Sequence, residues 1–311
     1  MQDLLRRYGG TLTGAFMLLT AFWLLALVVL PNVTLFEASF RPYLPIVDIG
    51  GPRDFYSLSN YQKFINNPVD TNFLGLSFQM PIHMKTFFNT VLFSALVTFI
   101  TFALSYPLAY YLAKVVAPAS LPTLMLLLFI PLWVSEALRA FAWYIILTYN
   151  GPLNGALVGL GLLEKPIRWQ NGVLTPYDAI VIGLVYTYVL FMLFPIYGSI
   201  QSLDRNQIEA SEDLGGKWWQ THWRVILPHA KPGIASGCVI VFMLSAGSLL
   251  VPTVLPSTSS NWFTQTIQVL MLESQDWNSG AAYSFLYIVL CTVVVTLVMW
   301  LFKVKLSDIA K

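Results

Sequence analysis

The stretch that decides the fold is residues 178–200, which read DAIVIGLVYTYVLFMLFPIYGSI. Its first residue, Asp178, is the only charged one, and the run is long enough for a helix that crosses the hydrocarbon layer, which takes about 20 residues. An unpaired backbone N–H or C=O costs several kcal/mol in hydrocarbon, so such a run must form regular helix. Residues 178–200 are therefore predicted to form a transmembrane helix.

Five further apolar runs are long enough to cross a membrane. They cover residues 11–35, 87–113, 121–148, 237–256 and 281–304, and Pro107, Pro131 and Pro195 are expected to kink three of the six helices. The run 237–256 is the shortest, and Pro252 and Pro256 interrupt its end. The six runs predict an all-α polytopic membrane protein with six transmembrane helices, in which residues 1–311 form a single transmembrane domain.

The composition agrees with a lipid environment. The chain of 311 residues is 57% hydrophobic and 10% charged, whereas a soluble domain carries about 25% charged residues. A formal net charge of +2 is too small to indicate a nucleic-acid partner, so membrane lipid is the expected surrounding. Cys238 and Cys291 lie in apolar runs and the three histidines are scattered, so no metal site is predicted.

The distribution of Lys and Arg predicts the orientation. If the N-terminus is cytoplasmic, the 17 Lys and Arg residues divide into ten inside, six outside and Arg139 within a span. Both termini are therefore expected in the cytoplasm, with residues 36–85 as an external loop and residues 201–236 as a cytoplasmic loop. The run 11–35 is too long for a secretory signal and lacks a small-x-small cleavage site, so it is expected to remain as the first span.

The cytoplasmic loop contains a predicted short helix. Residues 202–216 read SLDRNQIEASEDLGG, in which Asp204 or Asn206 can cap the helix and the acidic residues of its first turns suit the helix dipole. Gly215 and Gly216 are expected to end it, because glycine accepts the left-handed conformation at a helix C-terminus.

A second short helix is expected over residues 217–225, ending near Pro228. Ile208, Ala210 and Leu214 give the first helix a small apolar face flanked by acidic residues, which suits docking into a groove on another protein. The alternative reading is an ordinary solvated loop.

The order of residues in this loop resembles that of a known family. Residues 209–211 (Glu-Ala-Ser), Gly215 and residues 226–228 (Ile-Leu-Pro) resemble the "EAA…G…I-LP" loop of binding-protein-dependent ABC permeases. The resemblance implies a type I ABC importer permease fold with a cytoplasmic coupling helix, which docks into an ATP-binding subunit and carries its motion to the spans. The coupling residues implied are Glu209, Ala210, Ser211, Leu214 and Gly215, of which Ser211 replaces the alanine of the family.

The resemblance extends from residue 56 to residue 282. Further matching motifs lie at residues 56–61, 88–90, 106–110, 131–135, 139, 142–143, 151–154 and 276–282. They are most similar to the polyamine (spermidine/putrescine) branch and its first-permease type, although residues 256–258 (Pro-Ser-Thr) stand where that branch has Gly-Gly. The resemblance implies import of a small organic cation such as putrescine or spermidine, or else of another small solute such as an opine or an amino-acid derivative.

The resemblance also implies partners: a dimer of ATP-binding subunits, a second homologous permease subunit and an external substrate-binding protein. Residues 215–217 (Gly-Gly-Lys) lack the earlier glycine and the following hydroxyl of a P-loop, and no Gly-x-Ser-x-Gly or His-Glu-x-x-His occurs. The chain is therefore expected to be no enzyme, with ATP and Mg bound by the partner subunit. A secondary transporter predicts internal repeats that the sequence does not clearly show. An intramembrane enzyme requires a set of polar catalytic groups in the helices, and the sequence shows no convincing set.

Two ionisable residues lie within the third predicted span. Glu136 and Arg139 are three residues apart and share one face of a helix, and ionisable groups at membrane depth usually face a cavity or a partner. With Trp133 and Ser135 they are the candidate residues of a translocation path, in which Glu136 would line the route of a cation and Arg139 would steer or gate it. The alternative is a self-neutralising structural pair.

Overall fold

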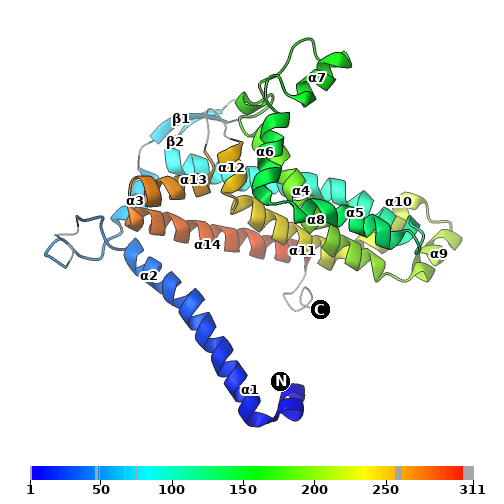
Figure 1. Cartoon of the computed structure of the whole chain (residues 1–311), viewed down its shortest axis with the longest axis horizontal. Coiled ribbons are helices and arrows are strands. Elements are labelled where there is room, and N and C mark those ends of the chain that lie inside the picture. Colours follow the sequence, from blue (N-terminus) through cyan, green and yellow to red (C-terminus); the bar gives the residue numbers. More distant parts are fainter. Residues whose placement is uncertain are drawn as a thin grey trace. The chain divides into compact units, whose positions relative to one another are not determined.

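The computed structural model describes residues 2–45, 48, 50–66, 68–73, 76–255 and 261–303, and this part of the chain is predominantly helical (Figure 1). Five of the described helices are long and apolar enough to cross a membrane, and a bent pair makes six if it counts as one span. The predicted all-α membrane architecture is confirmed. Two compact units are distinguished, one within Met1–Pro81 and Ile267–Ile288 and the other within Ile82–Thr266 and Val289–Lys311.

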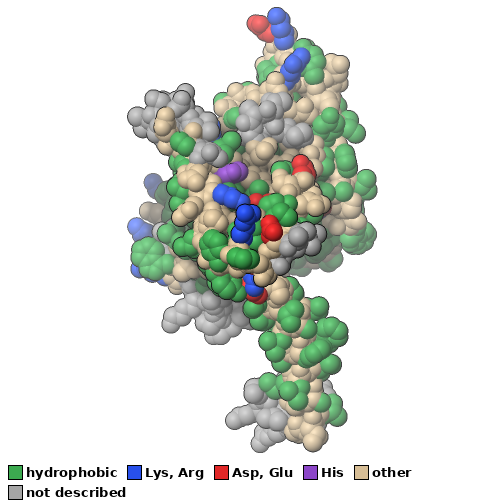
Figure 2. All heavy atoms as spheres, turned by 90° about the vertical axis from the view of Figure 1, so that its left-hand side faces the viewer, with side chains coloured by type: hydrophobic (Ala, Val, Ile, Leu, Met, Phe, Trp, Pro, Cys, Tyr) green, Lys and Arg blue, Asp and Glu red, His purple; other side chains and the backbone are tan. Residues whose placement is uncertain are grey.

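The first unit begins with a long apolar helix. It comprises α1 (Gln2–Leu24), a π-helical turn (Leu25–Val29) and α2 (Leu30–Ser39), and it is continuous from Gly9 to Ser39. Almost none of its length is buried, and Figure 2 shows hydrophobic side chains along it. Because a contiguous apolar surface of this size is unfavourable in water, the helix fits the predicted first span.

The rest of the first unit contains ordered elements that were predicted only as an external loop. α3 (Ser59–Ile65) is followed by an antiparallel hairpin of β1 (Pro68–Phe73) and β2 (Leu76–Pro81), whose register pairs Pro68 with Pro81. A single hairpin is marginally stable alone and leaves a weak sequence signal. Near the end of the chain, α13 (Phe263–Gln268) belongs mostly to the second unit, whereas a π-helical turn (Val269–Glu273) belongs to the first. α14 (Trp277–Phe302) begins in the first unit, ends in the second and corresponds to the predicted span 281–304.

A polar network joins α3 to the start of α14 within the first unit. Lys63 Nζ lies 3.1 Å from Asp276 Oδ2 and 2.8 Å from Ser279 Oγ. Asp276 Oδ1 also accepts a hydrogen bond from the N–H of Ser279, 3.0 Å away, so it acts as a cap of α14. Burial alone would raise the pKa of Asp276, but hydrogen bonds from Ser279 and the charge of Lys63 hold this pKa below its ordinary value.

The second unit is a bundle of helices. In chain order it consists of α4 (Ile82–Tyr110) with a π-helical turn (Tyr111–Val115), α5 (Leu121–Trp133), α6 (Glu136–Ile146), α7 (Pro152–Gly159), a 3-10 turn (Trp169–Asn171), α8 (Asp178–Gln201), α9 (Arg205–Asp213), α10 (Trp218–Thr221) with a π-helical turn (His222–Ile226), α11 (Leu227–Ala246) and α12 (Leu250–Val254).

The helix α8 forms the centre of this bundle and packs against both α4 and α11. Its side chains Met192 and Ile196 are fully buried. The approach of α11 depends on two glycines, since a Cβ on Gly233 would lie 2.3 Å from the carbonyl oxygen of Pro195, and one on Gly237 would lie 2.7 Å from Met192 Sδ. Small residues at such positions let membrane helices approach closely.

The third predicted span, 121–148, is broken rather than kinked. α5 and α6 are separate helices, bent by 86° relative to each other. Pro131, the expected kink, lies inside α5. The break comes later because Val134 takes an extended conformation and Ser135 starts a new helix, accepting a hydrogen bond at Oγ from the N–H of Leu138.

The fifth span begins earlier than predicted. Trp218–Ala246 is one continuous helix of 29 residues, so the prediction of a separate short helix over 217–225 that ends near Pro228 is wrong. The π-helical turn leads directly into α11, so Pro228 lies inside the continuous helix, directly after this turn, and does not end it. The predicted run 237–256 is likewise not one helix, because α11 ends before α12 begins, and residues 256–258 lie outside the described residues.

Asp276→Asn is expected to remove a pH-dependent part of the stability of the first unit. The pKa of Asp276 is lower in the folded chain than the ordinary value of about 3.9 expected when unfolded, so its carboxylate stabilises the fold fully above that value. The stabilisation is lost as the pH falls through the folded pKa. Between pH 6 and pH 3 the melting temperature of the wild type should therefore fall further than that of the variant. Equal decreases would contradict the stabilising role of the Asp276 carboxylate.

Gly233→Ala is expected to loosen the packing of α11 on α8. The added methyl group would meet a backbone carbonyl, and overpacking of this kind costs about 1–3 kcal/mol. Gly198→Ala is the matched control, because a Cβ on this glycine of α8 meets nothing within 4 Å. Thermal unfolding of the detergent-solubilised protein should show a lower melting temperature for Gly233→Ala only, and a wild-type melting temperature would show that α11 can move aside.

Candidate functional site

The predicted short helix of the loop is present as α9. Asp204 has an extended conformation and its Oδ1 accepts a hydrogen bond from the N–H of Asn206 at 3.0 Å, so Asp204 is the N-cap. At the other end Gly215 has φ of +77°, a conformation that glycine adopts without cost. The cap and the glycine stop predicted from the sequence are therefore confirmed.

The turn after α9 needs its second glycine for a different reason. The N–H of Gly216 donates to the carbonyl oxygen of Ser211 at 2.9 Å. A Cβ on Gly216 would lie 2.6 Å from that oxygen, closer than any side chain can approach. The chain can therefore reverse within two residues only because both are glycine.

The loop is a helix–turn–helix whose first arm is α9 and whose second arm is the helix that begins with α10. A hydrogen bond between two hydroxyl groups joins these arms. Ser211 Oγ lies 3.0 Å from Thr221 Oγ1, and Thr221 is buried. Alanine at position 211 would leave the Thr221 hydroxyl without this partner, which costs about 1–3 kcal/mol for a buried group. The serine that departs from the family pattern thus has a structural role in fixing α9 to α10.

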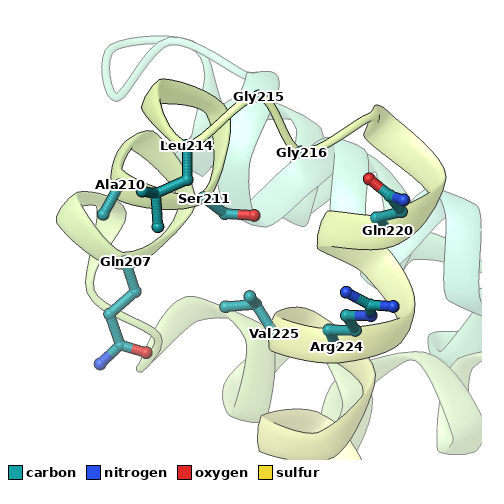
Figure 3. A pocket seen from close by; sticks show the side chains of 9 residues that line it. All are labelled: Gln207, Ala210, Ser211, Leu214, Gly215, Gly216, Gln220, Arg224 and Val225. Atoms are coloured by element: carbon teal, nitrogen blue, oxygen red, sulfur yellow. The ribbon is translucent and has the colours of Figure 1, made fainter.

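A groove of about 670 Å³ lies between the arms (Figure 3). Its lining residues come from α9, from the turn and from the helix that begins with α10, and they are Gln207, Ala210, Ser211, Leu214, Gly215, Gly216, Gln220, Arg224 and Val225. Four of the five predicted coupling residues therefore lie together. The fifth, Glu209, does not line the groove and pairs with Arg205 at 3.2 Å on the exposed side of α9.

Sequence reasoning missed five lining residues of this groove. Gln207, Ala210 and Leu214 are spaced by three and four residues, which is the spacing of one helical face, so Gln207 could have been found from the pattern. Gln220 and Arg224 could not, because the helical pattern of residues 217–225 does not show which face of that helix lies opposite α9.

The predicted apolar face of α9 is only partly correct. Ile208 is buried and packs into the core of the second unit, whereas Leu214 is 89% exposed and Ala210 is exposed. Ile208 therefore holds α9 to the bundle and cannot take part in docking. The apolar surface that α9 and its C-cap offer to a partner consists of Ala210 and Leu214.

The candidate translocation residues lie around the break between α5 and α6. Trp133 ends α5 and is 76% exposed, while Ser135 caps α6. Glu136, in the first turn of α6, accepts a hydrogen bond at Oε1 from the hydroxyl of Tyr188 at 3.1 Å. Carboxylates are stabilised at this end of a helix by its dipole.

Arg139 points to a different partner. Its Nη1 donates to the carbonyl oxygen of Thr187 at 3.3 Å, and among the described residues it forms no ion pair with Glu136. The reading of the two as a self-neutralising pair is therefore not supported. A small cavity of about 250 Å³ beside α6 is lined by Arg139 but not by Glu136, Trp133 or Ser135.

The fold and the loop define a class of protein: a polytopic helical membrane protein whose spans continue into a helix–turn–helix with an exposed tip. The chain belongs to the family described as "Binding-protein-dependent transport system inner membrane component", whose model matches residues 4–304. It is therefore a multi-pass inner-membrane component of such a transport system, as the residues of the loop predicted.

Two curated relatives cover most of the chain. It is 31% identical over 292 residues to the spermidine/putrescine transport system permease protein PotB of Salmonella typhimurium (strain SL1344), a match that spans 93% of this chain and 94% of that protein. It is also 31% identical over 262 residues to the protein of the same name from Escherichia coli (strain K12), with 84% and 87% covered.

A solved structure shares the fold. A chain in the crystal structure of a bacterial alginate ABC transporter, in complex with an alginate pentasaccharide-bound periplasmic protein, matches with a TM-score of 0.70 and 17% sequence identity. The match covers 98% of this chain and 99% of that chain. The predicted ABC importer permease fold is confirmed.

Proposed function

We propose that this chain is one of two membrane-spanning permease subunits of an ATP-driven importer of a polyamine such as putrescine or spermidine. The observation that carries the proposal is the 31% identity over nearly the whole length of two spermidine/putrescine permease proteins. An external binding protein delivers the polyamine, and a second permease subunit completes the channel.

In this proposal the chain itself does not hydrolyse ATP. No P-loop occurs in the sequence, so ATP and Mg bind to a separate pair of ATP-binding subunits. The excess of Lys and Arg in alternate segments supports an orientation with both termini and residues 201–236 in the cytoplasm, and with residues 36–85 outside.

The geometry of the loop suits a mechanical role. The groove residues and the exposed Leu214 give α9 a surface for docking on an ATP-binding subunit. The hydrogen bond between Ser211 and Thr221 ties α9 to the second arm, which is one continuous helix with α11. A displacement of α9 by the ATP-binding subunit would therefore pass into a membrane span without crossing a flexible joint.

Glu209→Arg is expected to detach the ATP-binding subunit. In this proposal docking buries the exposed carboxylate on α9 against the ATP-binding subunit, and loss of one partner of a charge pair buried in an interface costs about 2–5 kcal/mol. We expect at least about a tenfold loss of ATPase activity that copurifies with the tagged chain from membranes, with unchanged amounts of inserted protein.

Glu164→Arg is the matched control for this experiment, because it makes the same charge reversal at an exposed carboxylate outside the loop. It should leave the copurifying ATPase at the wild-type level. If the wild-type chain brought down no ATPase at all, the proposed function itself would be wrong.

The break between α5 and α6 supports a place in the translocation path. Irregular backbone at membrane depth is tolerated only where it is buried in protein or lines a cavity. The non-helical residues Val134 and Ser135 directly precede Glu136, whose carboxylate is held in position by a hydrogen bond from the hydroxyl of Tyr188. A fixed carboxylate beside a helix break can attract an ammonium group, with Trp133 and Arg139 on either side of it in the sequence.

Glu136→Gln is expected to lower polyamine import about tenfold while the ATP-binding subunit still copurifies. The amide keeps the size and the hydrogen-bonding capacity of the side chain but removes the charge that attracts the cation. Uptake of radiolabelled spermidine into proteoliposomes measures the effect, with Glu164→Gln as the control for loss of one carboxylate. Wild-type uptake by Glu136→Gln would exclude this carboxylate from the path.

A further inference from the structure

A buried histidine lies where the second arm of the loop meets α4. Nδ1 of His222 is 3.0 Å from the hydroxyl of Tyr106, and the His222 ring is 5% exposed. The rings of Tyr110 and Trp218 enclose it, with centroids 4.5 Å and 4.2 Å away. A buried histidine is usually a satisfied part of a core, but Nε2 of His222 has no hydrogen-bond partner among the described residues.

The contact with Tyr106 therefore fixes the orientation of the His222 ring. Aromatic rings on its flanks limit its rotation, and one hydrogen bond to α4 selects the position within that limit. His222 also begins the π-helical turn between α10 and α11, and such turns occur often at functional sites. Tyr106 is thus joined to the point where the loop enters its membrane span.

A second contact joins the same end of α4 to the residue where the loop begins, just before α9. Lys114, in the π-helical turn that follows α4, donates from Nζ to the carbonyl oxygen of Leu203. Leu203 directly precedes Asp204, the N-cap of α9, and it is buried. One end of α4 is therefore bonded to the residue that precedes the cap of α9 and to the π-helical turn that follows α10.

We propose that Tyr106, Lys114 and His222 form a clamp that positions the loop and transfers its displacement to α4. The inference rests on the proposed function, since it requires an ATP-binding subunit that moves α9. The hydrogen bond between the hydroxyl groups of Ser211 and Thr221 holds the two arms together. The clamp bonds both the beginning of the loop, at Leu203, and its second arm, at His222, to one end of α4. A push on α9 then moves α4 together with α11, so both helices that flank α8 change position in one step.

The clamp makes Tyr106 and Lys114 positioning residues, which act through the loop and touch neither ATP nor the solute. Loss of the clamp should leave the ATP-binding subunit attached and active but let the loop move without α4. The quantity that reports this is the number of solute molecules imported per ATP hydrolysed. A merely structural role would lower the amount of assembled transporter and leave this ratio unchanged.

The test compares Tyr106→Phe with Tyr110→Phe in the complete transporter, reconstituted in proteoliposomes with its binding protein and radiolabelled spermidine. Both changes remove one hydroxyl from α4 and keep the ring, but only Tyr106 bonds to His222. We expect about a fivefold fall in spermidine imported per ATP for Tyr106→Phe, the lower end of typical coupling effects. Tyr110→Phe should match the wild type, and an unchanged ratio for Tyr106→Phe would overturn the proposal.

A second measurement does not depend on the identity of the solute. Hydrogen exchange over residues 106–115 should change when ATP and vanadate are trapped on the wild-type complex, and this change should be much smaller in Tyr106→Phe. Lys114→Met should act in the same direction, and Lys114→Arg should restore the response because it keeps a cationic donor. The same response in Tyr106→Phe and the wild type would exclude the clamp.

The two proposals fail in distinguishable ways. If the ATP-binding subunit copurifies and Glu209→Arg removes it, but Tyr106→Phe couples normally, the proposed function stands and the clamp is wrong. If no ATP-binding subunit copurifies with the wild type, both are wrong.

Discussion

The close packing of α8 against α4 and α11 is the interaction on which the second unit depends. Lipid tails are as apolar as the side chains of the helices, so helices in a membrane gain little from the hydrophobic effect when they associate. What remains is van der Waals contact, which Gly233 and Gly237 permit by bringing α11 against α8, and hydrogen bonds such as that from Ser105 Oγ to the carbonyl oxygen of Val189 at 3.1 Å. Because α10 and α11 are one continuous helix, the same packing fixes the second arm of the loop.

The loop is consequently rigid at its base and exposed at its tip. Leu203 and Ile208 are buried at the base, and Thr221 is buried where the two arms meet. Leu214, at the end of α9, is 89% exposed. A surface that must bind a partner and move a helix needs both properties, since an exposed tip without a fixed base would move without displacing anything else.

The sequence predicted those parts of the fold that depend on local physics. The apolar runs, the Asp204 cap and the stop at Gly215 follow from hydrocarbon, hydrogen bonding and backbone conformation within a few residues. The start of the fifth span was placed too late, because Pro228 suggests a helix end unless one knows that a π-helical turn precedes it. Similarly, Pro131 predicted a kink in the third span, whereas the span is broken at Val134, which has an extended conformation.

The candidate site likewise contains some features that the sequence predicted and others that it did not. Ala210, Ser211, Leu214 and Gly215 were found because they are neighbours in the sequence and in the loop. The burial of Ile208 and the separate partners of Glu136 and Arg139 were not, because each depends on what the rest of the bundle places opposite. Helical spacing shows which residues share a face but does not show what that face meets.

The first helix and the end of α9 both expose apolar side chains, and the charges near them indicate different surroundings. The helix Gly9–Ser39 has no charged residue between Thr11 and Phe36, so this stretch contains the roughly 20 uncharged residues that are needed to cross the hydrocarbon layer. On α9 the exposed Leu214 stands beside Glu212 and Asp213, and an ionised carboxylate is costly in hydrocarbon. Burying a leucine contributes about 1.5–3 kcal/mol, so Leu214 gains most in a groove that is apolar where it meets the leucine and polar around it. That description fits a protein surface and not a lipid, which is why the loop, unlike the first helix, is expected to be completed by a partner chain.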